Sequence, residues 1–136
     1  MNEIQYYRIL NDEKNSIFKN IRRRLEVDKD ILFAYLHGSF LRRKYFRDID
    51  IAIWIEESDK AFYYTVKFSV KLTSILKFPV DIQVLNNAPL SFKYYVFMNG
   101  RLIFSRDEDL RTRIIDKVVR EYIDFKYFLK LHSPIH

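Results

Sequence analysis

Two carboxylates stand two residues apart in the first half of the chain, at Asp48 and Asp50. In a β-strand, residues i and i+2 point to the same face, so these carboxylates project together while the isoleucines that alternate with them project the other way. Two neighbouring carboxylates can converge on one or two hard divalent cations, which prefer oxygen ligands and bridge the oxygens of a nucleoside triphosphate. The pair therefore predicts a metal and phosphate site.

A glycine–serine pair precedes these carboxylates, with eight residues between Ser39 and Asp48. Gly38 lets the backbone turn sharply and approach a ligand, and Ser39 adds a hydroxyl at the start of a short helix expected at 40–44. Amide hydrogens at a helix start attract phosphate. Taken alone, Gly-Ser is an ordinary turn, but its position before the two carboxylates favours a phosphate-binding loop.

The loop between the turn and the carboxylates carries four cations, Arg42, Arg43, Lys44 and Arg47. We interpret them as residues that grip or steer a triphosphate, and we single out Arg42 and Arg43 as nucleotide-binding candidates. The alternative is a solvated basic loop. A second basic run, 22–24, is either a solvated helix face or a phosphate contact.

A third carboxylate, Asp81, lies at the start of a predicted strand at 80–85. The alternation of this strand puts Asp81 and Gln83 on one face and the apolar residues on the other. Whether Asp81 lies beside Asp48 and Asp50 depends on the order of the strands, which spacing alone does not reveal. The alternative is a surface aspartate at a strand start.

The hydrophobic pattern predicts one α/β (α+β) domain over residues 1–136. Helices are expected at 12–27, 40–44, 60–77, 89–98 and 107–131, and strands at 31–36, 48–55, 80–85 and 101–104. In the 60–77 helix, the inward stripe is expected to hold Phe62, Val66, Val70, Leu72, Thr73 and Leu76.

The last predicted helix, 107–131, has apolar residues over more than one narrow stripe. It is therefore either packed deeply in the core or shared with a partner, which includes a homodimer. The tail at 133–136 is expected to fray.

The composition of the chain indicates which classes of binding partner and which cellular compartment to expect. A net charge of +6 and a pI near 9.5 favour anionic partners such as nucleotides, nucleic acid or an acidic protein, although basic solvated faces give the same balance. The absence of cysteine excludes thiol ligation and thiol redox chemistry. With no signal-peptide pattern and no apolar run of about 20 residues, we expect a cytoplasmic protein with no membrane partner.

The order of these motifs resembles the nucleotidyltransferases of the DNA polymerase β superfamily. The resembling features are a strand, Gly38-Ser39, a short helix, Asp48-Ile49-Asp50 on the next strand and Asp81 on a third. More narrowly, the chain resembles the minimal nucleotidyltransferases (MNT), small proteins often paired as antitoxins with a HEPN-domain toxin. The resemblance implies a small mixed β-sheet with helices packed on it.

The resemblance also implies roles for the candidate residues. Gly38 and Ser39 would hold the β- and γ-phosphates of ATP or another nucleoside triphosphate. Asp48, Asp50 and Asp81 would be the catalytic carboxylates that bind two Mg²⁺ ions, and Asp81 would help to deprotonate the acceptor hydroxyl. Two such metals stabilise the attacking and leaving oxygens of an in-line displacement.

Three functions stay open at this point. The first is transfer of AMP, or another nucleotide, to a hydroxyl, with a tyrosine of a HEPN toxin as the acceptor that the resemblance implies. The second is an antitoxin of weak or absent catalytic activity that neutralises its toxin by direct binding. The third is nucleic-acid binding through the basic residues at 22–24 and 42–47, which predicts an affinity that falls steeply with salt.

Overall fold

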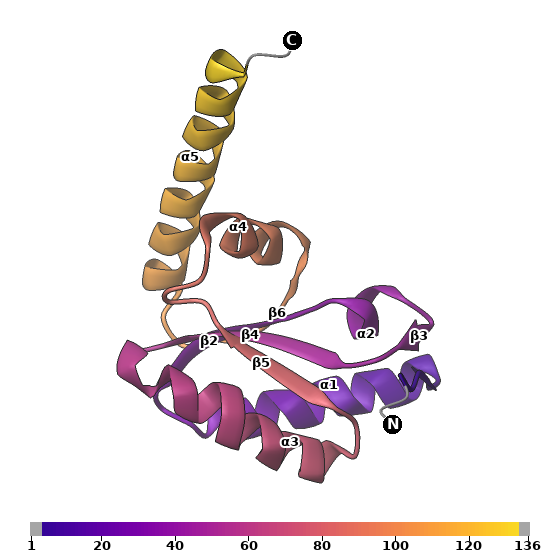
Figure 1. Cartoon of the computed structure of the whole chain (residues 1–136). Helices are drawn as coiled ribbons and strands as arrows, with labels where there is room; N and C mark the ends of the chain where they lie inside the picture. Colours follow the sequence, from indigo (N-terminus) through magenta and orange to yellow (C-terminus); the bar gives the residue numbers. More distant parts are fainter. Residues whose placement is uncertain (1–3, 134–136) are drawn as a thin grey trace.

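The computed structural model describes residues 4–133 of the chain, and its centre is a four-stranded mixed sheet (Figure 1). The strands follow the order β5-β4-β2-β6, in which β4 and β5 are parallel and the other pairs are antiparallel. Their bounds are Ile31–His37 for β2, Ile49–Ile55 for β4, Val80–Val84 for β5 and Arg101–Ser105 for β6. The expected small mixed sheet is confirmed.

A second, two-stranded sheet was not predicted. It pairs β1 (Tyr7–Arg8) with β3 (Tyr45–Phe46), so the N-terminal segment lies against the loop that leads into β4. Two-residue strands lie below the length at which alternation gives a sequence signal. Between β2 and β3 runs the short helix α2 (Ser39–Arg42), shorter than the expected 40–44.

Helices cover both faces of the main sheet (Figure 1). One face is covered by α1 (Asn11–Glu26) and α3 (Ser69–Leu76), and the other by α4 (Leu90–Asn99) and the first half of α5 (Glu108–His132). Within residues 4–133, no helix has both the length and the apolar character needed to cross a bilayer.

Strand β4 shows how the sequence divides the two faces. Its isoleucines at 49, 51, 53 and 55 are fully buried in the core that α1 and α3 close. The intervening residues Asp50, Ala52 and Trp54 point to the face of α4, where Ala52 packs with Phe33 and Val96. The predicted period of two along this strand is therefore confirmed, and it places Asp50 on the less completely covered face.

The predicted stripe of the helix at 60–77 is wrong in its first half. Phe62, Val66 and Val70 are 71%, 44% and 67% exposed, whereas Tyr64 and Phe68 are buried. The segment contains a 3₁₀ turn at 58–60 and a π-helical turn at 63–68 before α3. A π turn holds more residues than an α turn, so it rotates the inward face relative to an ideal helix.

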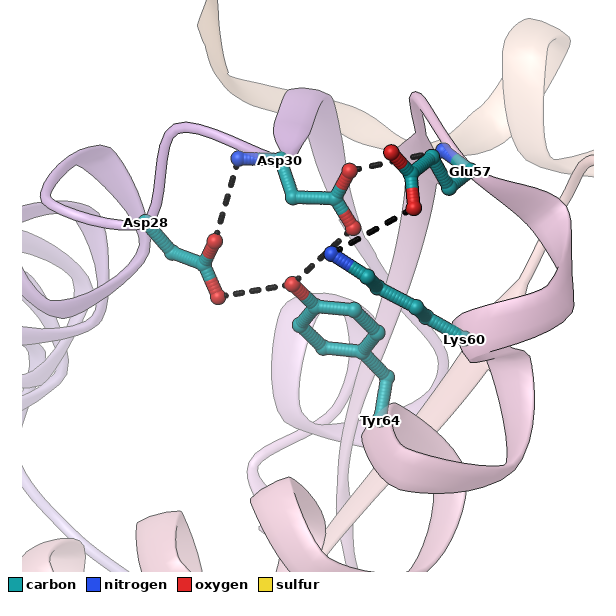
Figure 2. Close-up of polar contacts among 5 residues, drawn as sticks. All are labelled: Asp28, Asp30, Glu57, Lys60 and Tyr64. Carbon is teal, nitrogen blue, oxygen red and sulfur yellow. Dashed lines mark hydrogen bonds and ion pairs between the residues drawn. The ribbon is translucent and has the colours of Figure 1, made fainter.

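Hydrogen bonds of Tyr64 fix this register (Figure 2). The Tyr64 hydroxyl donates to Asp28 Oδ2 over 2.8 Å and lies 3.2 Å from Asp30 Oδ2, so the π turn is tied to the loop before β2. Glu57 and Lys60 form an exposed ion pair of 3.5 Å beside it. Burial and these carboxylates raise the pKa of Tyr64 well above its usual range, so the hydroxyl stays protonated.

Helix α5 projects away from the sheet beyond α4 (Figure 1). Val118 is its one buried residue in the described part of the chain, and the stacked rings of Tyr94 and Tyr122, 3.8 Å between centroids, hold its middle against α4. Its last turns expose large apolar side chains: Ile123, Phe125, Tyr127, Phe128, Leu129 and Leu131. The expectation of fraying at 133–136 concerns residues that, apart from Ser133, lie outside the described part.

Candidate functional site

The Gly-Ser turn and the first two carboxylates line one cavity of about 420 Å³. It lies where β2 ends and β4 begins, because these antiparallel neighbours bring His37 opposite Asp50. The lining residues are Gly38, Ser39, Arg42, Arg43, Arg47, Asp48, Asp50 and Tyr95. The chain therefore gathers hydroxyl, guanidinium and carboxylate groups at one end of the sheet.

Gly38 is required by the geometry of this turn. Its φ of 80° and ψ of −161° lie in a region open to glycine and strained for other residues. A Cβ atom at this position would lie 2.3 Å from Asp50 Oδ2. The turn can therefore approach the carboxylate only without a side chain.

The loop that follows is fastened to its surroundings at several points. Ser39 Oγ accepts a long hydrogen bond of 3.4 Å from the backbone N–H of Arg47. Lys14 Nζ, on α1, donates to the carbonyls of Phe40 and Arg43 over 2.8 and 2.7 Å. Since the last carbonyls of a helix lack helical partners, Lys14 satisfies carbonyls at the end of α2 and fixes the loop in place.

The arginines of the loop keep cationic groups available for a ligand. Arg42 donates from Nη2 to the backbone carbonyl of Asn99, at the end of α4. In residues 4–133, none of the ion pairs involves Arg42, Arg43 or Arg47. Guanidinium groups at the mouth of a cavity favour phosphate, which they can bind with two hydrogen bonds.

The third carboxylate comes from the neighbouring parallel strand. In the register of β4 and β5, Asp50 lies opposite Asp81. Gln83, two residues after Asp81, donates from Nε2 to Asp81 Oδ2 over 2.7 Å and lies 3.4 Å from Asp50 Oδ1. Asp81 is exposed at the edge strand and is not among the residues that line the cavity.

Burial and four neighbouring side chains shift the pKa of Asp50. Burial, the largest influence, raises the pKa of the Asp50 carboxyl, and the charge of His37 acts to lower it. The carboxylates of Asp81 and Asp48 raise the pKa further, and the hydrogen bond from Gln83 lowers it. The net result is a raised pKa, caused first by burial and then by the two neighbouring carboxylates.

The donor set matches a hard divalent cation in chemical type. Carboxylates are the oxygen ligands that Mg²⁺ prefers, and a cation would favour the ionised form of Asp50, whose pKa is raised first by burial and then by the charges of Asp81 and Asp48. In residues 4–133, however, no three acidic, histidine or cysteine side chains are gathered closely enough to hold a metal ion. The types of these side chains therefore suit a divalent cation, but in this structure the Asp81 carboxylate is hydrogen-bonded to Gln83.

The structure brings together most of the residues predicted from the sequence and places three further residues beside them. Six of the seven candidates line the cavity, and Asp81 stands in register with Asp50. The missed residues are His37, Gln83 and Tyr95. His37 adjoins the Gly-Ser turn and Gln83 shares a predicted face with Asp81, but Tyr95 lies on α4 and has no signal in the sequence that relates it to the turn.

Comparison with known families gives one match. Residues 19–109 match the family described as Polymerase beta, Nucleotidyltransferase, a span that includes every candidate site residue. No curated protein matches the chain.

Several solved structures share the fold. One is described as a tri-AMPylated Shewanella oneidensis HEPN toxin in complex with MNT antitoxin, with a TM-score of 0.67 and 19% identity over 87% of this chain and 93% of that chain. Another is the toxin–antitoxin MntA-HepT, with a TM-score of 0.61 and 19% identity over 90% and 94% of the two chains. A third is a toxin–antitoxin with AMP-PNP, with a TM-score of 0.62 and 20% identity over 90% of this chain and 94% of that chain.

Proposed function

This chain belongs to the polymerase beta nucleotidyltransferase family, and from this premise we propose that it transfers AMP, or another nucleotide, from a nucleoside triphosphate to a hydroxyl group. The observation that carries the proposal is the cavity at which Gly38 of the turn meets the Asp50 carboxylate, with arginines at the same opening. This arrangement suits a substrate that brings several negative phosphates beside metal-binding carboxylates.

The proposed roles follow the chemistry of each group. The backbone at Gly38 and Ser39 binds the β- and γ-phosphates, and Arg42 and Arg43 neutralise their charge. Asp48, Asp50 and Asp81 would hold two Mg²⁺ ions, which when bound supply charge stabilisation at the attacking and leaving oxygens.

The transfer itself is an in-line displacement at the α-phosphorus. The acceptor oxygen bonds to the α-phosphorus, the bond to the bridging oxygen of the β-phosphate breaks, and pyrophosphate leaves. The exposed Asp81 carboxylate, on the edge of the sheet, is the group that an incoming acceptor meets, and we assign it the hydroxyl proton. Most of the rate then comes from positioning and charge stabilisation.

We assign the acceptor to a tyrosine of a HEPN toxin, which makes the chain an MNT antitoxin in the cytoplasm. Support comes from structures of similar fold, which include the tri-AMPylated HEPN toxin with its MNT antitoxin and the MntA-HepT pair. The toxin–antitoxin with AMP-PNP supports an adenine nucleotide as the donor.

The test is to incubate the chain with ATP, MgCl₂ and a HEPN-domain protein whose gene neighbours its own, and to measure the mass of that protein by mass spectrometry. We expect mass gains in whole multiples of one adenylyl group (AMP less one water), and their loss in the double variant Asp48→Asn with Asp50→Asn. The double variant Asp59→Asn with Asp109→Asn, at two exposed positions outside the site, is the matched control. An unmodified toxin in the wild-type reaction contradicts the proposal.

Neutralisation by direct binding is the second candidate, because α5 exposes six large apolar side chains over its last turns. Under that function, the Asp48→Asn and Asp50→Asn chain still protects cells from the toxin although it transfers nothing. Loss of protection in this variant favours the enzyme. A homodimer through α5 predicts a dimer in solution, and nucleic-acid binding predicts an affinity that falls steeply with salt.

A further inference from the structure

A histidine and a glutamine form a hydrogen-bonded row behind the carboxylates. His37, the last residue of β2, is 6% exposed and lies opposite Asp50 in the register of the sheet. Its Nε2 lies 2.7 Å from Gln83 Oε1, and Gln83 Nε2 lies 2.7 Å from Asp81 Oδ2. The row therefore crosses three adjacent strands, β2, β4 and β5, at the end of the sheet where the cavity opens.

The direction of each hydrogen bond in this row is fixed. The amide nitrogen of Gln83 can only donate, and it faces the carboxylates of Asp81 and Asp50 at 2.7 and 3.4 Å. Its amide oxygen can only accept, so His37 must donate to it from Nε2. If the amide were reversed, its oxygen would face two carboxylates with which it cannot form a hydrogen bond, and His37 would have to accept at Nε2 instead of donating.

Packing holds the histidine in this orientation. Its ring meets the rings of Phe92 and Tyr95 edge-on, with centroids 5.6 and 6.0 Å away. Both aromatic residues come from α4, so the helix that covers this face of the sheet also restrains His37. A restrained donor at His37 leaves one favourable orientation for the Gln83 amide.

The row answers a physical problem of the site. Asp50 and Asp81 stand in register on adjacent strands, and like charges there repel. Without a donor between them, the exposed Asp81 side chain is free to rotate toward solvent. The Gln83 amide places partial positive charge between the two carboxylates and gives Asp81 a fixed partner.

We propose that Gln83, oriented by His37, is a positioning residue that restrains the Asp81 carboxylate beside Asp50 before metal and nucleotide bind. This inference rests on the proposed nucleotidyltransferase site. Neither residue touches a reacting atom. They restrain the Asp81 side chain before the metal binds, so metal binding does not have to include the entropy cost of ordering it.

The test measures Mn²⁺ binding to the full chain without nucleotide, by the electron paramagnetic resonance signal of free Mn²⁺. Gln83→Leu keeps the approximate size of the side chain and removes both polar ends, and we expect its Kd for Mn²⁺ to rise roughly 10- to 100-fold. His37→Phe keeps a ring against α4 but removes the donor, and we expect a rise in the same direction.

Two further variants separate positioning from a merely structural effect. His37→Gln restores an Nε2 donor without the ring, so we expect Mn²⁺ affinity to recover toward that of the wild type even where the melting temperature falls. Phe92→Leu removes one of the two ring contacts of His37 but leaves Tyr95 and the hydrogen bond to Gln83 to hold the histidine, so we expect a lower melting temperature with Mn²⁺ affinity nearly unchanged.

The outcomes distinguish the inference from the function on which it rests. If the wild-type chain binds Mn²⁺ and both Gln83→Leu and His37→Phe bind it equally well, the positioning role is wrong and the proposed function stands. The role is also wrong if affinity follows melting temperature across all four variants. A wild-type chain that neither binds Mn²⁺ nor transfers AMP overturns both.

Discussion

Substitution of Gly38 by alanine should disturb the fold and the candidate site together, through two separable effects. The first is backbone strain, because an alanine at a φ of 80° and ψ of −161° occupies a region that side chains avoid. The second is a collision, because the new Cβ would lie 2.3 Å from Asp50 Oδ2. The carboxylate can swing away from the methyl group, but it then leaves the cavity.

The two effects have different sizes. Backbone strain of this kind costs about 1–3 kcal/mol. The collision with the Asp50 carboxylate adds an interaction free energy of about 0.5–1 kcal/mol between positions 38 and 50. This is at the low end for residues in contact, because the tip of a side chain moves more easily than the backbone. Unfolding entropy for a chain of 136 residues is roughly 0.29 kcal/mol/K, so a total loss of about 1.5–4 kcal/mol lowers the melting temperature by roughly 5–14 °C.

The assay is urea unfolding followed by fluorescence of Trp54, the single tryptophan, which stacks on Phe33 in the core with 5.9 Å between ring centroids. The variants are Gly38→Ala, Asp50→Ala and the double variant, which form a cycle. Removing the Asp50 carboxylate should relieve the collision and leave the backbone strain, so Gly38→Ala should cost less in the Asp50→Ala chain than in the wild type.

Gly100 supplies the control, since it is the only other glycine of the sequence. A Cβ there would lie 2.6 Å from the Val96 carbonyl oxygen, so Gly100→Ala also destabilises the chain, but its cost should be the same with or without the Asp50 carboxylate. A loss below about 0.5 kcal/mol for Gly38→Ala would refute the strain argument. Equal losses in both backgrounds would refute the contact with Asp50.

Three further changes test other parts of the structure. Tyr64→Phe removes a hydroxyl bonded to two carboxylates and should lower the free energy of unfolding in urea by about 1.5–3 kcal/mol, whereas Tyr63→Phe should change it by less than about 0.5 kcal/mol. Lys14→Met removes the hydrogen bonds to two loop carbonyls and should raise the Kd for ATP, measured by calorimetry, about five-fold, which equals about 1 kcal/mol. The control Lys19→Met, at an exposed position, should leave this Kd unchanged. Because the pKa of Asp50 is raised in the folded chain, the metal-free chain should lose stability as pH rises from the ordinary carboxyl pKa through the raised one. Asp50→Asn should remove this loss in metal-free unfolding curves measured from pH 3 to 7 at low salt. An unchanged pH profile in this variant would contradict the argument.

The parts of the site that lie close in sequence could be predicted, and the parts that depend on strand order could not. The predicted strand at 48–55 put Asp48 and Asp50 on one face by local alternation alone, and both line the cavity although β4 begins at Ile49. Asp81 lies in register with Asp50 because β5 pairs in parallel with β4. The sequences of these two strands do not determine that they pair or in which direction. His37 meets Gln83 for the same reason, across 46 positions of the chain.

The fold shows the same division between local and distant causes. The apolar period gave the strands of the main sheet and the span of α5 within a residue or two at each end. It misplaced Phe62, Val66 and Val70, because a π turn and the hydrogen bonds of Tyr64 rotate that helix. A bond between side chains 36 positions apart has no periodic signal in either segment.

The candidate site depends on a rigid face and an open face of the same strand. The isoleucines of β4 are fully buried against α1 and α3, so they fix the strand to the core, while Asp50 and Trp54 on the other face are only partly covered. A carboxylate on such a strand keeps its backbone position when its neighbours repel it, because moving it would open the core beneath. Burial first, and the neighbouring carboxylates second, therefore raise the pKa of Asp50, while Gln83 holds the Asp81 side chain at the edge of the sheet. Substitutions of the buried isoleucines should therefore change stability and ligand affinity together, whereas substitutions of Gln83 should lower affinity by more than the lost hydrogen bond to His37 lowers stability.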